Sequence, residues 1–94
     1  MTQAVFVRGS PNRLTLDGHA GYRPGEDIVC AAISALVYAL IGYLDSCGAA
    51  FEYDTGDGFA TVECEGHEEA FDVVISGLSQ LAEEYPAHVS LRCV

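Results

Sequence analysis

The sequence has no lysine and no tryptophan, and its only strongly basic residues are four arginines among 94 residues. Against these stand 14 aspartates and glutamates, so the formal net charge is −10 at pH 7. Binding to nucleic-acid phosphates requires clustered Lys and Arg side chains, so we set nucleic acid aside as a partner. We expect a charged partner to be basic, although an acidic surface can also serve only to keep a protein soluble.

The first ten residues, MTQAVFVRGS, lack the basic start and the long apolar segment of a signal peptide. We therefore expect a cytoplasmic protein whose thiols stay reduced. The four cysteines include no C-x-x-C pair, and the C-x-x-H of Cys64 and His67 has no second half-site of matching spacing. We accordingly predict neither a metal site nor a cofactor.

A membrane-spanning helix is not indicated either, although residues 28–44 carry no charge. A spanning helix usually needs about 20 apolar residues and is flanked by basic side chains. This run is shorter and is flanked by Glu26, Asp27 and Asp45 instead. We interpret it as a helix buried inside a soluble domain or dimer and expect no membrane contact.

The pattern of apolar residues predicts one domain over residues 1–94, with strands, helices and turns in a regular order. The expected order is β-β-α-β-β-α-β, an α+β fold with two helices on one side of a mixed, mostly antiparallel sheet. In the second helix, apolar residues recur at helical spacing and form one stripe. The expected ranges are strands at 3–9 and 13–20, a helix at 27–48, a hairpin at 49–66 with its turn at 54–58, a helix at 67–85 and a strand at 87–94.

The first helix is apolar on almost every face, and half of all residues are hydrophobic. A domain of this size buries only about 60–65% of the surface of its unfolded chain, so it has little core to cover such a helix on all sides. We therefore expect a homodimer that buries additional apolar surface.

The stretch DGHAGYRPGEDIVCAAISALVYAL places His19 and Cys30 on either side of a glycine- and proline-containing loop. Asp27 is a good N-cap for the helix, which puts Cys30 in the first turn. There the sulfur lies near unpaired backbone amides and the positive end of the helix dipole, and both favour the thiolate. A cysteine among alanines and isoleucines is, on the other hand, often only a small buried hydrophobic residue.

The loop is long enough to bring the His19 imidazole to the Cys30 sulfur, an arrangement that supports covalent cleavage of a peptide bond. Amides at the helix start, including that of Cys30, are candidates for an oxyanion site. Asp17 and Asp27 are near in sequence, but neither is clearly a third member, so we treat the site as a dyad. We interpret the remaining histidines as a helix-start and a strand-edge residue far from the motif, and the remaining cysteines as bystanders (His67, His88; Cys47, Cys64, Cys93).

The residues Gly18-His19-Ala20, followed by Gly25 and the segment DIVCAAISAL, resemble the Prp family of ribosomal-processing cysteine proteases. The general layout of the whole chain agrees with this family. The resemblance implies a dimeric α/β protease that removes an N-terminal extension from a large-subunit ribosomal protein, the one numbered twenty-seven. It also implies cleavage after an aromatic residue and hence an apolar pocket.

Carried over by position, the resemblance makes Cys30 the nucleophile and His19 its base, with Asp27 and Ser34 as supporting polar residues. The Ser34 hydroxyl either acts near the sulfur or bonds back to the carbonyl of Cys30. The loop before Cys30 is expected to clamp the substrate. Its candidate contacts are Gly21, Tyr22, Arg23 and Gly25, for which a solvated loop is the alternative.

Two other functions remain open from the residues alone. One is a non-catalytic acidic binding module or assembly factor that holds a basic ribosomal protein, with an affinity that weakens as salt is added. The other is a thiol redox sensor in which Cys30 pairs with a cysteine of a partner chain.

Overall fold

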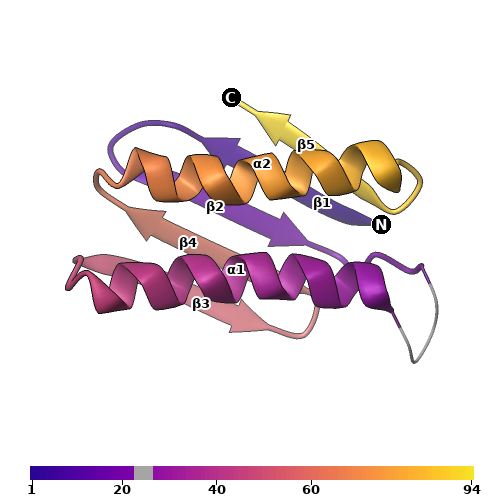
Figure 1. Cartoon of the computed structure of the whole chain (residues 1–94), viewed down its shortest axis with the longest axis horizontal. Helices are drawn as coiled ribbons and strands as arrows, with labels where there is room; N and C mark the ends of the chain where they lie inside the picture. The colour runs from indigo at the N-terminus through magenta and orange to yellow at the C-terminus, as the bar shows by residue number, and fades with distance from the viewer. Residues whose placement is uncertain (23–26) are drawn as a thin grey trace.

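The computed structural model of the chain describes residues 1–22 and 27–94. Its seven elements follow the predicted order, and the α+β fold is confirmed (Figure 1). Five strands form one sheet in the order β3-β4-β2-β1-β5. The elements are β1 (Thr2–Val7), β2 (Asn12–Asp17), α1 (Ile28–Ser46), β3 (Phe51–Gly56), β4 (Phe59–Cys64), α2 (Glu68–Glu84) and β5 (Val89–Cys93).

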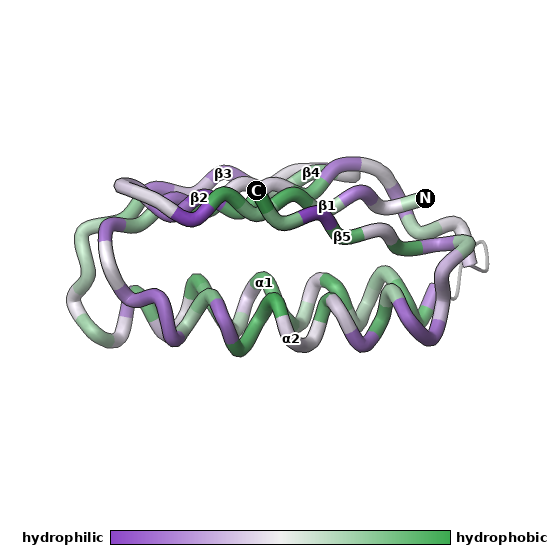
Figure 2. The backbone as a smooth tube through the Cα atoms, turned by 90° about the horizontal axis from the view of Figure 1, so that it is seen from above, coloured by the Kyte–Doolittle hydropathy of each residue, from purple (hydrophilic) through white to green (hydrophobic). Residues whose placement is uncertain are grey.

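The sheet is mixed and mostly antiparallel, as the sequence predicts. The pairs β1–β2, β2–β4 and β3–β4 are antiparallel, and β5 alone runs parallel to its neighbour β1. Both helices lie on the same face of the sheet (Figure 2). Alternate strand residues therefore point into one core layer, where Leu14, Leu16 and Val62 of the sheet meet Phe71 and Leu78 of α2.

The helices run antiparallel to each other across the sheet (Figure 1). The predicted apolar stripe of α2 is confirmed, with Phe71, Val74 and Leu78 fully buried. Gly77 of α2 faces Leu36 of α1 so closely that an added Cβ would lie 2.8 Å from a methyl carbon of that leucine. Glycine is thus what allows the two helices to approach each other at this position.

The β3–β4 turn is tighter than the sequence suggests. Asp54, Thr55 and Gly56 belong to β3, and only Asp57 and Gly58 connect the strands. Gly56 pairs with Phe59, whose ring occupies the place of a Cβ, so this strand position requires glycine. The shorter turn matters because it places Asp57 at the tip of the hairpin.

The described residues leave one side of α1 uncovered. By length and composition alone the helix would suffice to cross a membrane, but it packs five residues onto the core (Val29, Ile33, Val37, Leu40, Leu44). Its other side exposes the large apolar residues Ile28, Tyr38 and Tyr43. The sheet and α2 therefore cover one face of α1 and leave the opposite face open.

Candidate active site

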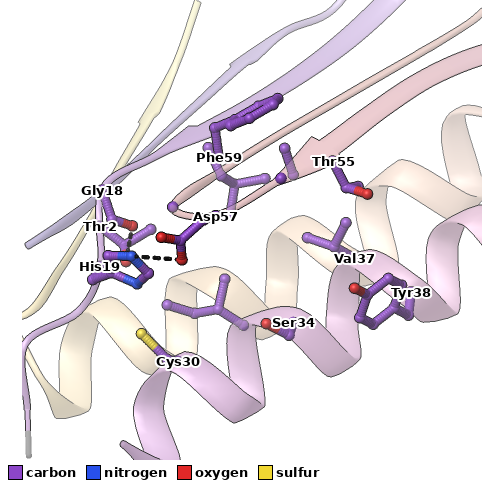
Figure 3. Close-up of a pocket in the computed structure, with 15 residues that line it drawn as sticks. Thr2, Gly18, His19, Cys30, Ser34, Val37, Tyr38, Thr55, Asp57 and Phe59 are labelled. Carbon is purple, nitrogen blue, oxygen red and sulfur yellow. Dashed lines mark hydrogen bonds and ion pairs between the residues drawn. The ribbon is translucent and has the colours of Figure 1, made fainter. Parts of the chain in front are cut away.

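A pocket of about 270 Å³ lies between the first turns of α1, the end of β2 and the tip of the β3–β4 hairpin (Figure 3). His19 and Cys30 both line it, together with Ser34. The residues that the sequence singles out on either side of the loop are thus brought to one cavity. Its apolar walls include Leu16, Ile33, Val37 and Ala60.

Asp27 organises the start of α1. One carboxylate oxygen, Oδ1, accepts a hydrogen bond from the amide of Cys30 (2.9 Å), and Oδ2 accepts one from the amide of Tyr22 (3.0 Å). These bonds, above all the one from Cys30, hold the pKa of Asp27 below its usual value. The N-cap role is as predicted, but the Cys30 amide is occupied by Asp27 and is therefore not a free oxyanion donor.

The Cys30 sulfur is half-buried and has a polar partner. The amide of Ala20, the residue directly after His19, donates to Sγ at 3.1 Å. This bond ties the residue that follows His19 directly to the Cys30 sulfur. Ala20 itself is fully buried, so this contact is part of the packed core.

His19 is held in place through the glycine that precedes it. The Gly18 amide donates to the carbonyl of Gly58 at 2.7 Å, and the Gly18 carbonyl accepts from the Thr2 hydroxyl at 3.0 Å. Gly18 has a φ of +91°, and a Cβ there would collide with the carbonyl of Met1. Only glycine fits this position, which fixes the backbone at the base of the imidazole.

The imidazole has an acidic neighbour that the sequence did not reveal. His19 Nε2 lies 3.2 Å from Oδ1 of Asp57 at the tip of the β3–β4 hairpin. Figure 3 shows the imidazole ring between the Asp57 carboxylate and the Cys30 sulfur. In the sequence, Asp57 is one of five residues in an expected turn. Only the pairing of β4 with β2 brings that turn to His19. Asp27, one of the two acids considered, instead binds the amides of Cys30 and Tyr22.

The start of the loop before Cys30 is anchored by aromatic contacts. The Tyr22 ring packs edge-on against Tyr85 and His88, with centroids 5.3 and 5.4 Å apart. His88 Nδ1 lies 3.0 Å from the carbonyl oxygen of Ala20. The sequence suggested that His88 is remote from the motif. The structure instead brings His88 to the start of the loop, because β5 lies beside β1.

The other predicted site residues have different outcomes. Ser34 lies on the pocket one helical turn after Cys30, and within the described part of the chain its hydroxyl makes no hydrogen bond, including none to the Cys30 carbonyl. Gly21 and Tyr22 are exposed at the loop start. Arg23 and Gly25 lie outside the described residues.

The remaining cysteines lie away from the pocket. Cys47 and Cys93 are exposed, whereas Cys64 is buried and donates through its sulfur to the carbonyls of Ala50 (3.8 Å) and Glu65 (3.4 Å). Burial raises the pKa of the Cys64 thiol, and the charges of nearby glutamates add to this effect. Within the described residues, Cys30 is the one cysteine that borders the pocket.

Comparisons with known proteins agree with this geometry. The family model described as "Cysteine protease Prp" matches residues 1–90. The ribosomal processing cysteine protease Prp of Mycoplasma pneumoniae is 30% identical over 88 residues, which is 88% of each chain.

Two crystal structures share the fold. One is an essential ribosomal processing protease Prp from S. aureus in complex with a covalently linked product peptide, with a TM-score of 0.89, 21% identity and full coverage of both chains. The other is SMU.848 from Streptococcus mutans, with a TM-score of 0.77 and 29% identity over all of this chain and 94% of that one. The family match spans almost the whole chain and includes both residues that meet at the pocket. This chain belongs to the Prp family of ribosomal processing cysteine proteases.

Proposed function

We propose that this protease removes the N-terminal extension of the large-subunit ribosomal protein numbered twenty-seven, with Cys30 as nucleophile and His19 as its base. The observation that supports these roles is that His19 and Cys30 line one pocket, with the Ala20 amide bonded to the Cys30 sulfur. The substrate is the one that the family resemblance implies, and the enzyme is expected to act in the cytoplasm.

The reaction proceeds in two steps. The Cys30 thiolate attacks the carbonyl carbon of the scissile peptide bond, and the His19 imidazolium gives its proton to the leaving amine as the C–N bond breaks. The product retained on the enzyme is a thioester of Cys30. Water, deprotonated by His19, then attacks the thioester and releases the extension with a free carboxylate.

Supporting residues hold this arrangement together. Asp27 accepts hydrogen bonds from the amides of Tyr22 and Cys30. It therefore caps α1 and also links the start of α1 to Tyr22. The Ser34 hydroxyl borders the pocket beside Cys30 and is placed to donate to bound substrate. The candidate substrate contacts that the resemblance implies are Gly21 and Tyr22, which are exposed at the loop start, and Arg23 and Gly25, which lie outside the described residues.

The pocket and the charge both suit such a substrate. Apolar walls formed by Ile33, Val37 and Leu16 beside Cys30 match an aromatic side chain before the cleaved bond. The net charge of −10 attracts a basic ribosomal protein and speeds the encounter. The acidic binding module without catalysis is the alternative that these two features also accommodate.

The decisive experiment incubates the unprocessed ribosomal protein with the native protein and with Cys30→Ala, and follows its mass by mass spectrometry. We expect a shortened product with the native protein only. Cys93→Ala, which removes an exposed cysteine away from the pocket, is the matched control and should cleave normally. An intact substrate in every reaction, with binding retained, would replace the protease by the binding module.

We also propose that two copies associate through the open face of α1. This face carries the small exposed residues Ala31, Ala35 and Gly42 as well as the large exposed residues Ile28 and Tyr38, so a second helix can approach closely. Ala35→Arg should convert a dimer into a monomer in sedimentation analysis, while Gln80→Arg on the exposed side of α2 should not. A native protein that sediments as a monomer would contradict the proposal.

A further inference from the structure

We propose that Asp57 is a positioning residue that holds the His19 imidazole toward Cys30, so that the site is a triad of Cys30, His19 and Asp57. This inference rests on the proposed roles of Cys30 and His19. Asp57 Oδ1 lies 3.2 Å from Nε2, and because a carboxylate can only accept a hydrogen bond, it favours the imidazole tautomer with its proton on Nε2. In that tautomer the lone pair is on Nδ1, which is then the nitrogen available to act as a base.

The hairpin tip is tied to the histidine by its backbone as well as by the carboxylate. The Gly58 carbonyl accepts the Gly18 amide at 2.7 Å, so the turn is bonded to the residue before His19. Gly58 has a φ of +78°, and an added Cβ would lie 3.1 Å from Nε2 of His19. The glycine therefore leaves just enough room for the imidazole to lie against the turn, with the Asp57 carboxylate beside its Nε2.

The Asp57–His19 contact differs from the other ion pairs of the described chain in where it lies. Arg13 pairs with Glu63 at 3.3 Å between neighbouring strands, and neither residue borders the pocket. Asp57 and His19 both line the pocket that holds Cys30. The Asp57 side chain is 96% exposed, and ion pairs so exposed add little to stability. Its effect should therefore appear in the reactivity of Cys30 and hardly at all in the melting temperature.

The test compares Asp57→Ala, Asp57→Asn and the control Asp54→Ala. Asp54 is exposed on the same hairpin and carries the same charge, but it does not line the pocket. Among the described residues other than glycine, His67 alone has a positive φ, so alanine at position 57 introduces no backbone strain. Asparagine keeps an oxygen that can accept from Nε2 and should restore part of the function.

Two readouts are needed. The first is kcat and KM for cleavage: Asp57→Ala should lower kcat about tenfold to 100-fold with little change in KM, Asp57→Asn should lie between it and the native protein, and Asp54→Ala should match the native protein. The second is the rate at which neutral iodoacetamide alkylates Cys30 near pH 7, which needs no substrate. We expect this rate to fall several-fold in Asp57→Ala because less of the sulfur is held as thiolate.

The two readouts separate the failure of this inference from the failure of the proposed function. If the native protein cleaves nothing, the alkylation rate still decides whether Asp57 acts on Cys30 through His19. Native rates in Asp57→Ala, or an equal loss in Asp54→Ala, would overturn the inference. So would a melting temperature of Asp57→Ala that falls enough to explain the loss by unfolding.

Discussion

Each of the two helices begins beside a cysteine, and the two helix starts lie at opposite ends of the sheet (Figure 1). Cys30 lies in the first turn of α1, which contains no acidic residue, and its sulfur accepts the Ala20 amide. Cys64 precedes α2, whose first turn carries Glu68 and Glu69. Its sulfur is buried, and its thiol donates to backbone carbonyls.

The comparison shows that closeness to a helix start does not by itself make a cysteine reactive. At Cys64, burial raises the pKa of the thiol, and the charges of Glu65 and Glu68 raise it further. At Cys30 the sulfur instead accepts the Ala20 amide and borders the pocket. Its hydrogen-bond partner and its access to a pocket distinguish the candidate nucleophile from the structural thiol.

The largest effect is expected when each sulfur is removed in turn. Cys30→Ala should reduce cleavage at least about 1000-fold without unfolding the domain. Cys64→Ala should retain cleavage but lower the free energy of unfolding by about 1 kcal/mol, because a buried sulfur loses its packing contacts. Cleavage assays and urea unfolding of both variants would measure this. An equal loss of cleavage in the two variants would break the comparison.

The next effect concerns the rate of alkylation as a function of pH. Near neutral pH, Cys30 should react with iodoacetamide much faster than Cys64, and peptide mapping would give the order of labelling. The pKa of the Cys64 thiol is higher in the folded protein than in the unfolded chain. The folded protein therefore keeps the thiol proton at pH values where the unfolded chain releases it. This contribution to stability is complete below the ordinary thiol pKa and is lost as the pH rises above it. Alkaline destabilisation should therefore be weaker in Cys64→Ala.

A smaller effect is expected from Asp27→Asn, which leaves one acceptor oxygen for the two amides. The melting temperature should fall at pH 7, because one of the two amides loses its acceptor. The pKa of Asp27 is lowered in the folded protein, so its contribution to stability is complete above the ordinary value near 3.8 and is lost as the pH falls further. The difference in melting temperature from the native protein should accordingly shrink in acid. Asp54→Asn serves as the control and should show no such pH dependence.

The smallest effect belongs to the start of α2. His67 adopts a left-handed conformation, with a φ of 54°, and its side chain makes no capping hydrogen bond. His67→Gly removes the Cβ that disfavours this conformation and should raise the free energy of unfolding by about 0.5–1 kcal/mol. Urea unfolding would detect the change, and cleavage should be unaffected. A destabilised His67→Gly variant would show that the imidazole contributes contacts that compensate for the backbone.

Much of the fold follows from local patterns. The strand segments, the N-cap at Asp27 and the stripe on α2 are all local, and the structure confirms them. The strand order β3-β4-β2-β1-β5 is not local and was not predicted. The sequence therefore indicated which segments form elements but not which strand ends would meet.

The residues of the candidate site also fall into those placed by local sequence and those placed by strand pairing. His19, Cys30 and Asp27 lie on one continuous stretch, so local rules and the motif bring them together. Asp57 and His88 reach that stretch only through the pairing of β4 with β2 and of β5 with β1. Their surroundings in sequence, a turn and a strand edge, gave no sign of this role.

The parallel pairing of β5 with β1 also joins the last part of the chain to be made to the first. During translation His19 and Cys30 leave the ribosome before Asp57, and His88 follows last. Yet His88 lies against the Ala20 carbonyl, and its own carbonyl accepts the Thr2 amide at 2.9 Å. A chain made only as far as α1 therefore already carries His19 and Cys30, but the contacts of Asp57 and His88 with this stretch wait for the rest of the chain.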